Sequence, residues 1–165
     1  MHLNKISLAV LAAGLTVAGS ALAATTSSTF QVTANVVAQC SISAANLGFG
    51  AVDPLGVNVD ASSALTVKCT KNSAYTVGLD AGVTVGATIA ARKMANGADI
   101  MNYNLYTDAA RASVWGNTTG TWASGTGAGM GTAQTLTVYG RVPTGQTNLA
   151  VGNYTETTIT ATVTY

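Results

Sequence analysis

Hydrophobic and polar residues alternate one by one in several short segments of the chain, which is the pattern of a β-strand with one buried face. In residues 30–36, for example, every second residue is apolar and the residues between are polar. The same alternation recurs in residues 47–50, 65–70, 75–80, 101–105, 136–142 and 158–165. No segment after residue 23 combines a helical spacing of apolar residues with capping residues at both ends. The pattern therefore predicts an all-β fold.

Turn-forming residues separate these predicted strands. Asp53-Pro54-Leu55-Gly56 and Asn96-Gly97 are typical turn sequences, and the glycine-rich stretch 116–131 is predicted to be a loop. Segment 82–92 supports two interpretations, since its Val and Thr residues favour another strand whereas residues 87–91 favour a helical turn. Short strands that each have one apolar face, with turns between them, are typical of a β-sandwich of two packed sheets.

The two end segments have strand patterns whose partners the sequence does not identify. The first apolar stripe follows the N-terminal region directly and consists of Phe30, Val32, Ala34 and Val36. The last predicted strand carries Ile159, Ala161, Val163 and Tyr165 on one face. The N-terminal stripe can pair within its own domain or add itself to another molecule, and the alternation fits both interpretations.

Residues 1–23 are predicted to be a signal peptide. A short positive start with Lys5 precedes an apolar run, and Ala21-Leu22-Ala23 matches the small-residue cleavage pattern, so the exported chain is expected to begin near Ala24. The alternative is a transmembrane anchor, but the uncharged stretch ends in small and polar residues rather than basic ones. Cleavage removes the single histidine and leaves equal numbers of basic and acidic residues.

Charge is scarce in this chain of 165 residues, of which only 8% are charged and 48% are hydrophobic. The formal net charge of +1 supplies no basic field, and this argues against nucleic-acid binding. The charge is also too low to hold a disordered tail open. A near-neutral surface does little to keep chains apart, so the composition favours association.

Two cysteines, Cys40 and Cys69, remain after cleavage. Export to an oxidising compartment makes a disulfide between them the expected state, with two separate buried thiols as the alternative. The bridge would tie the first strand region to the next.

Catalytic chemistry is poorly represented in the exported chain. It has no histidine, and oxidised cysteines provide no nucleophile, so no enzyme activity, metal or cofactor is expected. The acidic residues are spread singly over the chain and are expected to bond their own backbone in turns: Asp53, Asp60, Asp80, Asp99, Asp108 and Glu156. A carboxylate pair that meets in space, as in glycoside hydrolases, is the alternative.

Four aromatic residues could instead form a sugar-binding site, although such residues more often lie in the core or at the rim of a sandwich. They are Tyr103, Tyr106, Trp115 and Trp122.

Several motifs resemble the spore coat protein U domain family. They include Leu47-x-Phe49-Gly50 and the cysteine pair, and they stand in the family's order over residues 27–165. The longer motifs lie in residues 103–111, 114–116, 136–143 and 152–165.

The resemblance implies a subunit of the archaic chaperone-usher pili of Gram-negative bacteria, with an immunoglobulin-like sandwich that lacks its final strand. Residues 24–37 would form the donor strand, with Phe30, Val32, Ala34 and Val36 as its inserting side chains, and residues 38–165 the pilin domain. The strand that carries Ile159 to Tyr165 would border the acceptor groove. Implied partners are identical or related subunits, a periplasmic chaperone and an outer-membrane usher, and the implied locations are the periplasm in transit and then the cell surface. The family also points to adhesion and biofilm formation.

Three other functions remain as alternatives. A monomeric secreted module could fold its own N-terminal strand inward and bind a glycan, or serve as a spore-coat or cell-surface coat protein. An extracellular hydrolase is disfavoured by the missing histidine. A tip adhesin within the family is expected to carry a further receptor-binding domain, for which this length leaves no room.

Overall fold

The computed structural model describes residues 22–165, so most of the predicted signal peptide, residues 1–21, lies outside the described part. The chain divides into two units between Asn35 and Val36. Residues 22–35 are exposed and form no strand. Within residues 22–165 no helix is long and apolar enough to cross a membrane.

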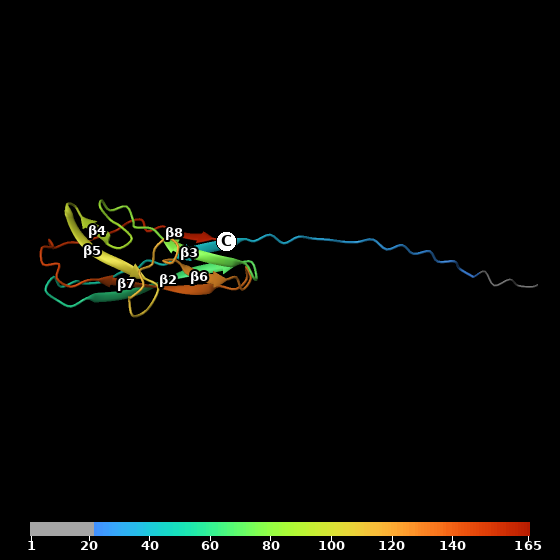
Figure 1. Ribbon diagram of the computed structural model, residues 1–165, viewed down its shortest axis with the longest axis horizontal. Coiled ribbons are helices and arrows are strands. Elements are labelled where there is room, and N and C mark those ends of the chain that lie inside the picture. The colour runs from blue at the N-terminus through green and yellow to red at the C-terminus, as the bar shows by residue number, and fades with distance from the viewer. Residues whose placement is uncertain (1–21) are drawn as a thin grey trace, which may run out of the picture. The chain divides into compact units, whose positions relative to one another are not determined.

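The second unit consists of β-strands joined by turns and loops (Figure 1). The strands are β1 (Cys40–Ala44), β2 (Val59–Cys69), β3 (Ala74–Leu79), β4 (Arg92–Asn96), β5 (Asp99–Tyr106), β6 (Ala123–Thr126), β7 (Gln134–Val142) and β8 (Ala161–Thr164). The predicted all-β fold is confirmed. The alternating segments 65–69, 75–79, 101–105 and 136–142 lie in β2, β3, β5 and β7.

The strands form two sheets in which every pairing is antiparallel. One sheet has the order β1-β2-β7-β5-β4, and the other has the order β6-β3-β8. In Figure 1 the β4–β5 hairpin lies at one end of the domain, and β3, β6 and β8 lie towards the other. The predicted turn at Asn96-Gly97 closes this hairpin, in which Asn96 pairs with Asp99 and Gly97 has φ +62°.

The core lies between the sheets and is filled by the alternating apolar residues of both. Its buried members are Leu65, Val67, Cys69, Tyr75, Val77, Leu79, Met94, Met101, Tyr103, Leu105, Trp115, Val138 and Val142. Gly140 leaves the space into which Leu47 and Phe49 pack, since a Cβ at this position would lie 2.9 Å from the Phe49 ring. Residues 47–50 form no strand, contrary to the prediction, because the Ser63 hydroxyl binds the carbonyl oxygens of Ala45 and Asn46 where the β1–β2 ladder ends.

Three other predicted segments differ from the structure. The predicted loop 116–131 contains β6, whose Gly125 allows close contact with β3, because a Cβ there would lie 2.5 Å from the Tyr75 ring. The last strand is shorter than predicted and begins at Ala161. The Asp80 N–H still donates to Thr160 O, but the Thr160 amide donates to the Asp80 side chain instead of to its carbonyl, which binds Arg92. Residues 82–91 form bends and turns, and β4 starts at Arg92.

Arg92 connects the two sheets from inside the core. Its side chain is fully buried, and its guanidinium donates hydrogen bonds to four main-chain carbonyl oxygens and one side-chain amide oxygen rather than to a carboxylate. The acceptors are Leu79 O (3.1 Å), Asp80 O (2.8 Å), Ile89 O (3.4 Å), Trp115 O (2.6 Å) and Asn104 Oδ1 (2.8 Å). Burial lowers the pKa of this guanidinium, and the ring of carbonyl oxygens compensates its charge.

Candidate functional site

Two edge strands, one from each sheet, lie next to each other without pairing. β1 ends the five-stranded sheet and β8 ends the three-stranded sheet, and some of their Cα atoms lie within 8 Å. No hydrogen-bonded register joins β1 to β8 among the described residues. Each strand therefore has one edge of main-chain N–H and C=O groups without a strand partner. We call β1, β8 and the apolar side chains beside them the open-edge region.

The β8 side of this region presents apolar side chains that are only partly covered. Val163 and Ala161 stand opposite Val77 and Leu79 in the β3–β8 register and face the core with them. Val77 and Leu79 are buried, whereas Val163 and Ala161 remain half-buried. This difference is expected for a strand with a neighbour on one side only.

Two further predicted groove residues flank β8. Ile159 is also half-buried and packs against the core. Tyr165, the fourth residue of the predicted face, is 53% exposed and lies after the end of β8. The structure therefore brings Ile159, Ala161 and Val163 to the core side and leaves Tyr165 largely in solvent.

The β1 side of the open-edge region is similar. Cys40 and Ile42 of β1 are half-buried against the core, while Ser41 and Ser43 between them are exposed. Phe49, which follows β1, packs instead against β7 at Gly140 and against β5, where it makes an edge-on contact with the Tyr103 ring at 6.0 Å between centroids. Sequence analysis did not identify Ile42, because β1 has too few apolar positions for its alternation to be recognised.

The predicted donor segment has the opposite property, since its apolar side chains are almost fully exposed. Phe30 is 87% exposed, and Val32 and Val36 are each 81% exposed. Ala34 is exposed as well, and no strand is formed in residues 22–39. An exposed apolar row of this length is unusual for a folded protein and indicates a surface that becomes covered.

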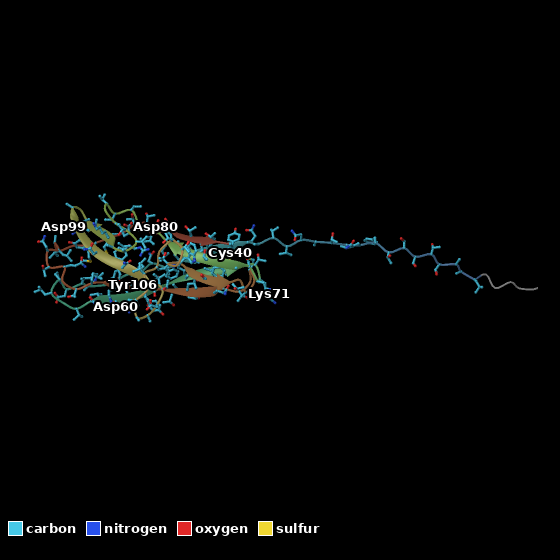
Figure 2. All side chains as sticks on the ribbon, viewed as in Figure 1. Cys40, Asp60, Lys71, Asp80, Asp99 and Tyr106 are labelled. Carbon is cyan, nitrogen blue, oxygen red and sulfur yellow. A yellow bond between two sulfur atoms is a disulfide. The ribbon has the colours of Figure 1, made fainter. Side chains whose placement is uncertain are left out.

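The predicted disulfide between Cys40 and Cys69 is present, with a Cα–Cα distance of 4.1 Å. The two residues stand directly opposite each other in the β1–β2 register, and Cys69 is fully buried. Cys40 is the first residue of β1 (Figure 2), so the bridge fixes the point at which the N-terminal segment joins the sandwich.

Replacing Cys40 by Ser is expected to lower the free energy of unfolding by about 3–4 kcal/mol, because the bridge closes a loop of about 30 residues in the unfolded chain. We expect a lower yield of folded protein and a smaller urea midpoint. The control is Ser41→Ala, since Ser41 is exposed in the same strand. An unchanged yield of the Cys40 variant would contradict the structural role of the bridge.

The acidic residues make different kinds of contact, and Asp60 is not the turn residue that was predicted, because it lies in β2 and pairs with Arg141 of β7. Asp60 accepts two hydrogen bonds from Arg141, at 2.7 and 2.8 Å, and these lower the pKa of its carboxyl group. Asp53 and Asp108 bind main-chain amides of their own turns, as predicted. Figure 2 shows Asp60, Asp80 and Asp99 at well-separated places. Within residues 22–165, no three acidic, histidine or cysteine side chains group as metal ligands.

Glu156 holds the loop after β3. Its carboxylate accepts hydrogen bonds from the main-chain amides of Val83 and Thr84, at 3.1 and 2.8 Å, and from the Thr84 hydroxyl. Burial alone would raise the pKa of Glu156, but these hydrogen bonds outweigh it and lower the pKa. The residue therefore has a structural role.

The aromatic residues considered for a sugar site are mostly internal. Trp115 is 1% exposed, and its indole N–H donates to Val77 O at 2.8 Å. Tyr103 is also buried, whereas Trp122 and Tyr106 are half-buried. The hypothesis that Trp115 stacks on a ligand is therefore wrong, because both faces of its ring are covered by the core.

Comparison with known proteins gives consistent matches. The sequence model of the Spore Coat Protein U domain matches residues 26–162. Protein U of Myxococcus xanthus is 38% identical over an alignment of 183 positions, and the alignment covers 99% of this chain and all of that protein.

One similar fold occurs in the crystal structure of the CsuC–CsuE chaperone–tip adhesion subunit pre-assembly complex from archaic chaperone-usher Csu pili of Acinetobacter baumannii. The TM-score is 0.57 with 21% sequence identity, and the match covers 79% of this chain. This chain spans only 40% of the length of that chain.

Proposed function

Since the chain belongs to the Spore Coat Protein U domain family, as its motifs indicated, we propose that it is a structural subunit of a secreted fibre that polymerises by strand exchange. The immunoglobulin-like sandwich expected from the sequence is confirmed by the two sheets and by the fold of the pilus-related chain. In the proposed fibre, residues 24–37 of one subunit enter the open-edge region of the next.

One observation carries this proposal, namely that the same chain has both an unpaired edge and an exposed strand-like segment. β1 and β8 offer main-chain groups without a strand partner, and half-buried apolar side chains lie beside them. Phe30, Val32 and Val36 form an exposed apolar row with the two-residue period of a strand. The edge lacks a strand partner and the segment lacks cover for its apolar side chains, so insertion of the segment at the edge would provide both.

The energy available from such an insertion is considerable. If Phe30, Val32 and Val36 are buried at about 1.5–3 kcal/mol each, they contribute about 5–9 kcal/mol before the costs of ordering. Main-chain pairing along β8 adds to this figure. A strand inserted between β1 and β8 would hold these two strands about 9.6 Å apart, which is two inter-strand spacings. Some of their Cα atoms now lie within 8 Å of each other, so β1 and β8 would have to separate there.

The proposed contact is head-to-tail. Each subunit donates its N-terminal segment to one neighbour and accepts a segment from the other, so the contact does not close on itself and produces a filament. We further propose a periplasmic chaperone that covers the open-edge region during transit and an outer-membrane usher at which the segments exchange. The fibre would then stand on the cell surface and serve adhesion and biofilm growth.

The family description favours a second candidate, a spore-coat or cell-surface coat protein. The same strand exchange would join its subunits, but they would form a layer over the cell. Electron microscopy of labelled protein on cells distinguishes thin fibres from a continuous coat.

Size-exclusion chromatography of the exported chain, with and without residues 24–37, tests the proposal. We expect the complete chain to form polymers and the shortened chain to form none, while still binding a peptide of residues 27–37. A matched control keeps the apolar stripe and replaces Gln31, Thr33 and Asn35 by Ser, and it should polymerise. A stable monomer whose own residues 30–36 are protected from hydrogen exchange would contradict the proposal.

A further inference from the structure

The residues that connect the donor segment to β1 are bound to Thr70. The main-chain N–H of Gln39 donates to the Thr70 hydroxyl oxygen at 3.0 Å, and the Thr70 N–H donates to Gln39 O at 2.8 Å. The Thr70 hydroxyl in turn lies 3.3 Å from Gln39 O and 3.5 Å from Val37 O. Three main-chain groups of residues 37–39 are therefore within reach of one side chain.

These bonds continue the β1–β2 pairing beyond the disulfide. In a regular ladder the Gln39 amide would donate to the Thr70 carbonyl, but this carbonyl accepts the Ser73 amide of the following turn, at 3.0 Å. The Thr70 hydroxyl replaces the occupied carbonyl as the acceptor for Gln39. Residues 37–39 are consequently held against the end of β2, in line with β1.

This arrangement limits how the donor segment could fill the open edge of its own subunit. Only residues 37–39 separate the stripe from Cys40, and they reach about 10 Å when extended. β1 has five residues and is about 17 Å long. For the stripe to lie beside β1 and parallel to it, residues 37–39 would have to run back along the whole length of β1. They are too short to do so, and the parallel arrangement is excluded.

Self-insertion then requires a hairpin in which residues 37–39 form the turn. A turn of this kind reverses the chain and uses the amide and carbonyl groups of these residues to close itself. Those are the groups that Thr70 binds, at Val37 and Gln39. The hairpin must break the bonds to Thr70 before it can form.

We propose that Thr70 is a positioning residue that disfavours self-insertion and so reserves residues 30–36 for a neighbouring subunit. This inference rests on the proposed function, because it concerns the choice between two acceptors for the same segment. The segment of a neighbouring subunit enters from outside and leaves the Thr70 bonds intact. Thr70 thus favours the polymer over a self-completed monomer.

Thr70→Val removes the hydroxyl and keeps the shape and the main-chain N–H of the residue. At low protein concentration we expect the ratio of self-completed monomer to polymer to rise about twofold to tenfold, the effect of one or two exposed hydrogen bonds. Size exclusion measures the ratio, and hydrogen exchange of amides 30–36 shows whether the monomer has inserted its own segment. Thr70→Ala should act in the same direction, and Thr70→Ser should behave as the wild type.

Thr66→Val is the matched control. Thr66 lies on the same strand as Cys69 and is half-buried like Thr70, but its hydroxyl makes no hydrogen bond within residues 22–165. The same substitution there should leave the ratio unchanged. An equal rise at both positions would overturn the inference, because it would assign the effect to general weakening of β2.

A peptide of residues 27–37 separates this inference from the proposed function. It is added to chains whose own segment is disabled by Val32→Asp, with either Thr or Val at position 70. Equal peptide binding by these two chains, together with more self-completed monomer when Thr70→Val is made in a chain that keeps Val32, supports the inference. If the peptide binds but the Thr70→Val and Thr70→Ala chains partition as the wild type does, the role of Thr70 is refuted and the proposed function stands. If no peptide binds, the proposed function itself fails.

Discussion

Replacing Val32 by Asp is expected to abolish fibre assembly while leaving export and the folded sandwich unchanged. Val32 lies in the middle of the exposed apolar row and is 81% exposed, so the substitution removes no contact from the isolated subunit. In the polymer it would place a carboxylate among the half-buried apolar residues beside β8. The loss of about 1.5–3 kcal/mol of apolar burial adds to the cost of burying an unpaired charge. Together they should weaken subunit association by at least about a hundredfold.

Thr33→Asp provides the control for charge alone. Thr33 is the next residue along the chain and belongs to the polar face of the same stripe, which an inserted strand would turn away from the core. We expect the Thr33 variant to assemble and the Val32 variant to remain unpolymerised, as measured by electron microscopy and sedimentation. Equal fibre yields from the two variants would show that residues 30–36 are not the donor strand.

The sequence predicted the strands with strong alternation and missed those without it. Tyr75, Val77 and Leu79 are large apolar residues at every second position, and they lie in β3 as expected. The sequence predicts a loop in place of β6, because Ala123-Ser124-Gly125-Thr126 contains no large apolar residue. Its pairing depends on the close approach of Gly125 to Tyr75, which is a contact between distant residues.

The open-edge region was predictable only in part. Alternation correctly assigned Ala161 and Val163 to the core side of the last strand. It does not show whether a strand has one neighbour or two, because that property depends on topology. The pairing of β8 with β3 alone, and its position beside β1, emerge only when the chain is folded. Thr70 was not found either, since its partners in residues 37–39 are main-chain atoms.

Arg92 is the clearest residue that sequence analysis missed. It stands two residues before Met94 and shares its inward face, but a lone arginine in a segment of unclear structure is ordinarily exposed. Its main-chain acceptors lie in three separate segments, at residues 79–80, 89 and 115, and no local motif encodes them.

Arg92→Met is expected to lower the free energy of unfolding by at least about 3 kcal/mol. The main-chain carbonyl groups that accept hydrogen bonds from Arg92 stay in the core after the substitution, so they lose their donor. The substitution leaves Leu79 O and Trp115 O without their guanidinium donor in the core. It also leaves Asn104 Oδ1 with one hydrogen bond fewer. Urea unfolding should be measured in the Val32→Asp background, so that polymerisation does not add to the stability.

Arg141→Met is the control for losing an arginine near the surface, because Arg141 is only half-buried and makes two hydrogen bonds against the five of Arg92. Its guanidinium binds Asp60 on the surface of the β2–β7 pair, and an exposed ion pair contributes about 0–1 kcal/mol. Arg92→Lys keeps the charge but reaches fewer acceptors, so its stability should lie between that of the wild type and the Met variant. A Met variant at position 92 that unfolds at the same urea concentration as the position 141 variant would show that Arg92 does not hold the two sheets together.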